Sequence, residues 1–286
     1  MSSDHSELKQ RLQTHLTEIV RERDPYLATA GHFYVQQYIR QQLAQWGTVS
    51  THEFIIQTRT HVNLILDLPA QAGRSSQPAI LIGAHYDAVP GTPGADDNAS
   101  GVAVLLELAR SFAAAPIRYP VRLVAFDLEE YGMVGSGEYA QALFQDNQPL
   151  RLMLSLEMLG YCTQAPNSQQ YPAEVLKKLY PDRGNFIGFI GNTATIPDLI
   201  RLNRAMRKMG TPSQWLPAGN KGQLLQATRL SDHSPFWDRG YRAIMVTDTA
   251  FLRNPHYHQA SDRIETLDLD FMTGVCQGLT EGLRRL

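Results

Sequence analysis

Three apolar runs that alternate with helical patterns limit what this chain can fold into. The runs are AILIGAHY at residues 79–86, VRLVAFDL at 121–128 and LRLMLSLEML at 150–159. Runs of this kind are typical of strands buried on both faces of a sheet. A helical stripe over residues 102–112 separates the first two, and a helical segment at 135–145 separates the second and third. The order predicts an α/β fold of three layers, helix-sheet-helix, with a mixed, mainly parallel central sheet.

The other segments extend this pattern, and we expect a single domain over residues 1–286. Amphipathic helices are predicted around residues 8–19 and 35–46, and two strands around a short turn within 50–69. A polar stretch rich in proline at about 163–183 is predicted to be an insertion or lid. The pattern then resumes with strands at 185–191 and 243–249 and helices at 196–209 and 266–286.

Charge and composition exclude several classes of protein. The formal net charge is −2 and no run of Lys and Arg occurs, so neither nucleic acid nor an anionic membrane is an expected partner. No apolar run approaches the ~20 residues that span a bilayer. With only Cys162 and Cys276, and with no visible signal peptide, a reduced cytoplasmic location is expected. A secreted protein whose leader had been removed would look the same.

Histidine and carboxylate side chains gather where the predicted strands end. His85 and Asp87 end the first run, Glu129 and Glu130 the second, and Glu157 the third. Asp96 and Asp97 follow the first strand, and His256, His258 and Asp262 follow the last. Ligands of open α/β sheets bind beyond the carboxyl ends of the strands. Four segments are therefore predicted to bring these groups to one edge of the sheet.

So many carboxylates share a crevice in ionised form only when cations are present. Imidazole and carboxylate together suit zinc, with manganese or cobalt as substitutes. Two metals ~3.5–4 Å apart, bridged by one carboxylate, would use five protein ligands and leave room for a water. A further carboxylate that binds no metal would serve as general base.

Each residue also has a purely structural interpretation. Asp96 and Asp97 precede a helix and could act as capping groups, and Asn98 could cap that helix in either case. Glu129 and Glu130 could be an exposed loop pair, and His85 alone could be a surface histidine. Their joint occurrence at strand ends favours the metal site.

Six motifs in order resemble those of the co-catalytic zinc exopeptidases. They are HYD, GADDNASG, LEEYGMVGS, SLEMLG, SDHSPFWDRG and HYHQASD, and the resemblance runs from about residue 30 to the C-terminus. That group includes bacterial leucyl aminopeptidases, glutamate carboxypeptidase II and the glutaminyl cyclases. The resemblance implies two zinc ions, an aminopeptidase activity and a peptide substrate with a free N-terminus.

The same resemblance implies roles for individual residues. His85 and Glu157 would hold one zinc, Glu130 and His258 the other, and Asp96 would bridge both. Glu129 would be the base, and Asp87 would fix the ring of His85. A cis peptide bond is expected between Asp96 and Asp97. The position of Glu157 is frequently aspartate in the aminopeptidases, so this chain departs from their pattern there.

Two other functions stay open from the sequence. A glutaminyl cyclase would use similar residues with one zinc, and a non-catalytic binding module would share the fold without turnover. Specificity is the least readable property of the chain. We expect Trp215 and Phe236 to form an apolar substrate pocket, with Phe189 near them and Asp232 organising that pocket.

Overall fold

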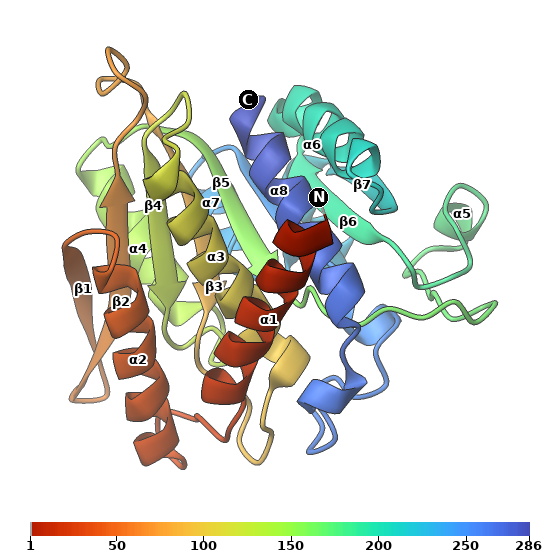
Figure 1. The fold of residues 1–286 in the computed structure, drawn as a ribbon, viewed down its shortest axis with the longest axis horizontal. Helices are drawn as coiled ribbons and strands as arrows, with labels where there is room; N and C mark the ends of the chain where they lie inside the picture. The colour runs from red at the N-terminus through yellow and green to blue at the C-terminus, as the bar shows by residue number, and fades with distance from the viewer. Residues whose placement is uncertain (1) are drawn as a thin grey trace.

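An eight-stranded sheet forms the centre of the structure, a computed structural model that describes residues 2–286 (Figure 1). Residue 1 of the predicted domain lies outside the described residues. The strands lie in the order β1-β2-β4-β3-β5-β8-β6-β7. Their bounds are β1 (Val49–Ile56), β2 (Arg59–Leu68), β3 (Ala79–His85), β4 (Val121–Phe126), β5 (Leu150–Glu157), β6 (Ile187–Asn192), β7 (Ser213–Ala218) and β8 (Ala243–Thr247).

Four central strands run in the same direction. β3 is parallel to both β4 and β5, and β5 is parallel to β8. On one side β2 is antiparallel to β4 and to β1, and on the other β6 is antiparallel to β8 and parallel to β7. The carboxyl ends of β3, β4, β5 and β8 therefore meet at one edge, which is where ligands bind in sheets of this type.

Helices cover both faces of the sheet, so the predicted three-layer α/β fold with a mixed sheet is confirmed (Figure 1). One core cluster packs α1 (Ser2–Ile19), α2 (Thr29–Ala44), α3 (Gly101–Ala114), α6 (Ile196–Lys208) and α8 (Leu269–Arg284) against one face. A second cluster packs α4 (Val134–Gln145) and α7 (Ser234–Asp238) against the other. The strand residues alternate between the two clusters, because successive side chains point to opposite faces.

β7 is the one strand that the apolar patterns did not predict. Its sequence is SQWLPA, and Pro217 cannot donate to a neighbouring strand. Such a strand is tolerated at the end of a sheet, where β7 lies. The polar stretch at 163–183 is mostly irregular and holds one short helix, α5 (Glu174–Lys177). Its role as a lid stays a prediction.

No helix within residues 2–286 is long and apolar enough to cross a membrane. Both cysteines carry free thiols, and Cys276 is buried in the core.

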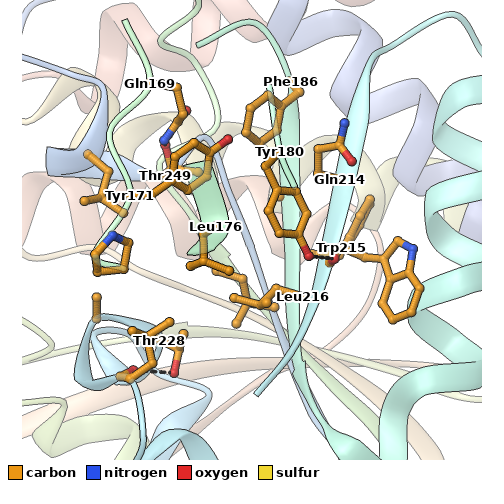
Figure 2. A pocket seen from close by; sticks show the side chains of 17 residues that line it. Gln169, Tyr171, Leu176, Tyr180, Phe186, Gln214, Trp215, Leu216, Thr228 and Thr249 are labelled. Atoms are coloured by element: carbon orange, nitrogen blue, oxygen red, sulfur yellow. Dashed lines mark hydrogen bonds between the residues drawn. The ribbon is translucent and has the colours of Figure 1, made fainter. Parts of the chain in front are cut away.

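A mainly apolar cavity lies between residues 169–180 and the strands β6 and β7 (Figure 2). Side chains that line it include Tyr171, Leu176, Tyr180, Phe186 and Leu216. The hydroxyl group of Tyr180 donates a hydrogen bond to the Trp215 carbonyl at 2.9 Å, which ties the polar stretch to β7. Trp215 borders this cavity, as does Phe189.

Phe236, expected beside Trp215 in the substrate pocket, lies elsewhere. It is fully buried on α7, and it is absent from the residues that line this cavity. Its ring centroid lies 6.3 Å from that of Phe126 and 6.0 Å from that of Tyr241. The pattern SPFW marked it as apolar, but α7 turns the ring into the second core cluster.

We predict that Phe236→Ala lowers the free energy of unfolding by about 3–5 kcal/mol, because it leaves a cavity in a closely packed core. Phe33→Ala is the matched control, since Phe33 is 62% exposed on α2. It should change stability by less than about 0.5 kcal/mol. Urea unfolding of the two variants checks this, and equal losses would contradict the core position of Phe236.

Candidate metal centre

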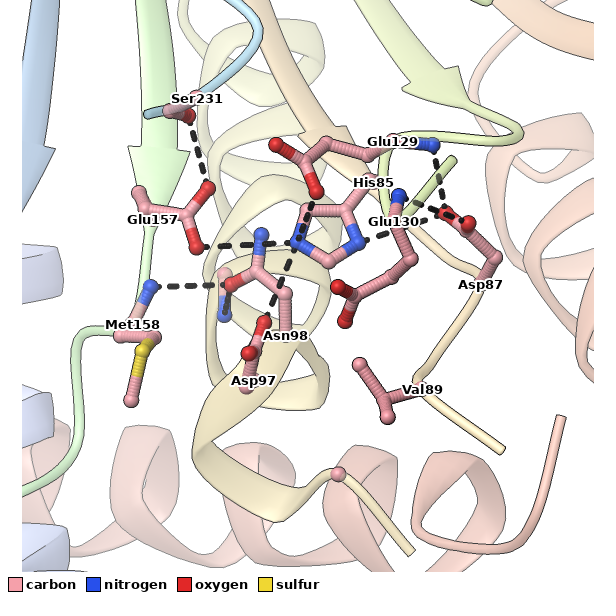
Figure 3. A network of polar contacts seen from close by, with 12 residues as sticks. His85, Asp87, Val89, Asp97, Asn98, Glu129, Glu130, Glu157, Met158 and Ser231 are labelled. Atoms are coloured by element: carbon pink, nitrogen blue, oxygen red, sulfur yellow. Dashed lines mark hydrogen bonds and ion pairs between the residues drawn. The ribbon is translucent and has the colours of Figure 1, made fainter. Parts of the chain in front are cut away.

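His85 is the last residue of β3, and its imidazole ring is fully buried among carboxylates (Figure 3). Its Nε2 atom lies 3.3 Å from Oδ1 of Asp97 and 3.6 Å from Oε1 of Glu157. Its Nδ1 atom lies 3.4 Å from Oδ1 of Asp87. Neither nitrogen forms a well-aligned hydrogen bond with a residue of the described chain. Buried ring nitrogens are rarely left in this condition, so the arrangement fits a cation between His85 and the carboxylates.

Asp97 presents one carboxylate oxygen to each of two histidines. Oδ1 faces His85, and Oδ2 lies 3.2 Å from Nε2 of His258. The Asp262 carboxylate accepts hydrogen bonds from the amides of Asp96 and Asp97, at 2.9–3.1 Å. Asn98 fixes the next turn, since its Oδ1 accepts from the amides of Gly101 and Met158. The carboxylate of Asp97 is therefore held between the two imidazoles.

Asp96, expected to bridge two metals, points away from these histidines. Its Oδ1 accepts from the amide of Gly160 at 2.8 Å, and its Oδ2 accepts from Nδ2 of Asn254 at 2.7 Å. The cis peptide bond also falls one residue later than expected, between Asp97 and Asn98. The assignment of Asp96 was wrong because the two adjacent aspartates point in different directions from the loop, which their sequence does not reveal.

Glu129 and Glu130 follow β4 and enter the same space. Their amides donate hydrogen bonds to the two carboxylate oxygens of Asp87, both at 3.1 Å. Asp87 thus contacts His85 on one side and orients the 129–130 backbone on the other. Oε2 of Glu130 lies 3.4 Å from Nε2 of His258, and Oε2 of Glu129 lies 3.9 Å from Nε2 of His85.

Glu157 ends β5 and is 6% exposed. Its Oε2 accepts a hydrogen bond from the Ser231 hydroxyl at 2.7 Å, which leaves Oε1 towards His85. Ser231 was not predicted as a site residue. It directly precedes Asp232 in the motif SDHSPFW, which is the one sequence feature that could have indicated it.

His258, and not His256, joins the cluster. Its ring stacks on Tyr257 with centroids 3.7 Å apart, while Nδ1 of His256 pairs with Ser261 at 2.9 Å. The loop places His258 at a positive φ of 57°, a conformation uncommon outside glycine. His258 is also the most exposed of these groups, with 36% of its side chain accessible.

The side chains divide into two sets that share Asp97. His85 lies against Oδ1 of Asp97 and also contacts Glu157, and His258 lies against Oδ2 and also contacts Glu130. Ligand atoms of His85, Asp97 and Glu130 all lie within 4.8 Å of one another, so this group could hold a metal ion. Two neighbouring cation positions with a carboxylate between them are the arrangement expected for a two-metal site.

Electrostatics show how strained the cluster is without a cation. Burial raises the pKa of Glu129 well above its usual range, and the charges of Glu157 and Asp232 add to the rise. Burial and the charge of Asp97 raise the pKa of Glu130 to about 7. Burial alone would lower the pKa of His258, but hydrogen bonds with Asp97 and Glu130 raise it to about 10. A bound metal ion would compensate the charges of these carboxylates in place of protons.

Asp232 lies beside this cluster, fully buried, with neither carboxylate oxygen bonded to a described residue. Burial is the largest cause that raises its pKa to about 7; the charge of Glu157 adds to the rise, and the charge of His85 opposes it. Its predicted contact with substrate stays a prediction.

Comparison with known proteins places the chain in a family. The model of peptidase family M28 matches residues 63–279. The Escherichia coli protein YfbL, which is uncharacterised, is 36% identical over 254 residues, covering 85% of this chain and 77% of its own length. The Bacillus subtilis aminopeptidase YwaD is 29% identical over 190 residues, which cover 65% of this chain but only 36% of that longer protein.

Solved structures share the fold at lower identity. The Legionella pneumophila LapA aminopeptidase superposes with a TM-score of 0.73 at 18% identity, over 99% of this chain and 73% of its own. A Bacteroides thetaiotaomicron glutaminyl cyclase bound to N-acetylhistamine superposes with a TM-score of 0.69 at 16% identity, over 99% and 98%. These two likenesses concern the fold alone. The extent of the family match decides the assignment: the chain belongs to peptidase family M28, a family of peptide hydrolases.

Proposed function

We propose that this chain is a zinc aminopeptidase whose two metal ions are bridged by Asp97. The observation that carries the proposal is the division of Asp97 between two histidines, each accompanied by its own glutamate. His85 and Glu157 would hold one ion, and Glu130 and His258 the other. Imidazole nitrogen and carboxylate oxygen are ligands that zinc prefers.

The residues present fit such ions. Oε1 of the buried Glu130 has no partner among the described residues, and neither ring nitrogen of His85 has one. Asp87 is placed to hold the ring of His85 through Nδ1, which leaves Nε2 for the metal. When bound, two zinc ions lower the pKa of a water between them and polarise the scissile carbonyl group.

Glu129 is the proposed general base. Its Oε2 lies 3.9 Å from Nε2 of His85, farther than the 3.6 Å that separates Oε1 of Glu157 from the same nitrogen. Glu129 would take a proton from the attacking water and deliver it to the leaving amine as the C–N bond breaks. A raised pKa suits a group that must hold and then release that proton.

The surplus of negative charge supports a substrate with a free N-terminus. A peptide's α-amine is positively charged near pH 7, and the buried Asp232, which is not a proposed ligand, would offer a carboxylate to it. An internal peptide bond brings no such charge, so we propose that cleavage removes one residue at a time from the N-terminus.

The glutaminyl cyclase and the non-catalytic module become outcomes of the same assay. Leucyl-anilide and glutaminyl-peptide substrates are incubated with zinc-loaded protein, and products are identified by mass spectrometry. Free amino acids support the aminopeptidase. Pyroglutamate as the sole product would replace it with the cyclase, and no turnover with zinc bound would favour the binding module.

We predict that Glu129→Gln lowers kcat about 10²- to 10⁴-fold, because the variant cannot accept the proton of the attacking water. Its zinc content should match the wild type, since Glu129 is not a proposed ligand. Glu138→Gln, an exposed change on α4, is the control and should keep full activity. A Glu129→Gln enzyme with near-normal kcat would exclude Glu129 as the base.

A pair of variants separates the two adjacent aspartates. Asp97→Asn should lose most of its zinc, because a neutral amide cannot bridge two cations. Asp96→Asn should keep its zinc, since its carboxylate accepts from Gly160 and Asn254 instead of facing the histidines. Metal analysis by mass spectrometry after dialysis gives the answer. Zinc lost from Asp96→Asn and kept by Asp97→Asn would reverse the assignment.

Zinc should bind more tightly as the pH rises from 6 to 8. His258 has a pKa of about 10 in the metal-free protein, so its imidazole carries a proton that zinc must displace throughout this range. Each displaced proton strengthens zinc binding by about tenfold per pH unit. Chelator competition at three pH values measures the slope. The control variant His256→Asn should show the same dependence of zinc affinity on pH as the wild type. A wild-type affinity that does not change with pH would contradict a protonated His258 in the metal-free protein.

A further inference from the structure

Arg23 is a fully buried cation in the segment between α1 and α2. It lies outside residues 63–279, which the family model matches. All three nitrogens of its guanidinium group donate to main-chain carbonyls. Nε donates to Tyr86 at 2.9 Å, Nη1 to Pro93 at 2.6 Å, and Nη2 to Gly94 at 2.8 Å and to Asp97 at 3.2 Å. Nη1 also reaches the carbonyl of Arg21 at 3.3 Å.

Apart from the carbonyl of Arg21, these carbonyls belong to the two ends of the loop that carries the proposed bridging residue. Tyr86 follows His85 at the end of β3, and residues 93–97 lead into α3. A planar group with donors in a fixed fork is suited to hold two chain segments at a set distance and angle. Asp97 is contacted through its carbonyl only, so its carboxylate stays directed at the histidines.

The loop is shaped around the guanidinium group at Gly94, which has a φ of 58°. A Cβ atom at that position would lie 2.8 Å from Nη2 and 2.9 Å from Nη1 of Arg23, and it would clash with the carbonyl oxygen of Asp97. The absence of a side chain at Gly94 is therefore what lets the loop close on Arg23.

The hydrogen bonds of Arg23 within residues 2–286 all go to main-chain carbonyls and none to a carboxylate, although burying an unpaired charge is expensive. The charges of Asp97, Asp262 and Asp87 act on it through space instead. Arg23 therefore adds one buried positive charge beside the carboxylates of the centre.

We infer that Arg23 is a positioning residue of the metal centre, which holds residues 93–97 so that the Asp97 carboxylate lies between His85 and His258. The inference rests on the proposed zinc site. It assigns part of the site to the N-terminal segment.

The test is the zinc affinity of the full-length protein, measured by chelator competition well below the unfolding temperature of every metal-free variant. Arg23→Gln should weaken zinc binding about 10- to 100-fold, the usual effect of removing a group that orients metal ligands. Arg23→Lys should recover part of the loss, because it keeps the charge but not the fork of donors.

Two control variants separate positioning from general destabilisation. Leu16→Ala removes a fully buried side chain of α1 and should lower the unfolding temperature without changing zinc affinity. Arg21→Gln removes a neighbouring arginine that stacks on Tyr34, 3.9 Å from the ring centroid, and should also bind zinc normally. Wild-type affinity in Arg23→Gln, or a loss no greater than that of Leu16→Ala, overturns the inference.

A second pair of variants applies if Arg23→Gln does not fold. Gly94→Ala inserts a methyl group between the loop and Arg23, whereas Gly91→Ala has the same kind of positive φ but nothing within 4 Å. Weaker zinc binding in Gly94→Ala alone supports the inference, and equal binding in both contradicts it. If the wild-type protein itself binds no zinc, that result would contradict the proposed function and not only the inference about Arg23.

Discussion

The repulsion between buried carboxylates at one edge of the sheet is the constraint on which the rest of the structure depends. Asp97, Glu129, Glu130 and Glu157 lie around one buried imidazole, in a space where charge is poorly screened. Burial raises the pKa of Glu129 and of Glu130 for this reason. A cluster of this kind is stable in its ionised form when cations occupy it, which is the physical basis of the proposed zinc site.

The parallel strands bring the groups together, but hydrogen bonds from other segments set their directions. The Asp87 carboxylate accepts hydrogen bonds from the amides of residues 129 and 130, and the Asp262 carboxylate accepts them from the amides of Asp96 and Asp97. Arg23 donates hydrogen bonds to carbonyl groups of the same loop. Because these supports come from distant parts of the chain, the geometry of the centre depends on the fold as a whole.

The sequence predicted the sheet and its helices because strands buried on both faces read as apolar runs. It also predicted that His85, Glu129, Glu130, Glu157 and His258 come together, since the carboxyl ends of parallel strands share an edge. β7 was missed because proline removed the usual strand pattern. Asp96 and Asp97 could not be separated, because which of two adjacent carboxylates faces the histidines depends on loop dihedral angles. Arg23 gave no signal, since its role depends on carbonyl groups 63 or more residues away.

The central claim is that Asp97 bridges two metal ions, and a crystal structure of the zinc-loaded protein with anomalous scattering at the zinc edge tests it most directly. The account predicts two anomalous peaks ~3.5–4 Å apart, with one oxygen of Asp97 directed at each. A single peak, or two peaks whose shared ligand is Asp96, would contradict it.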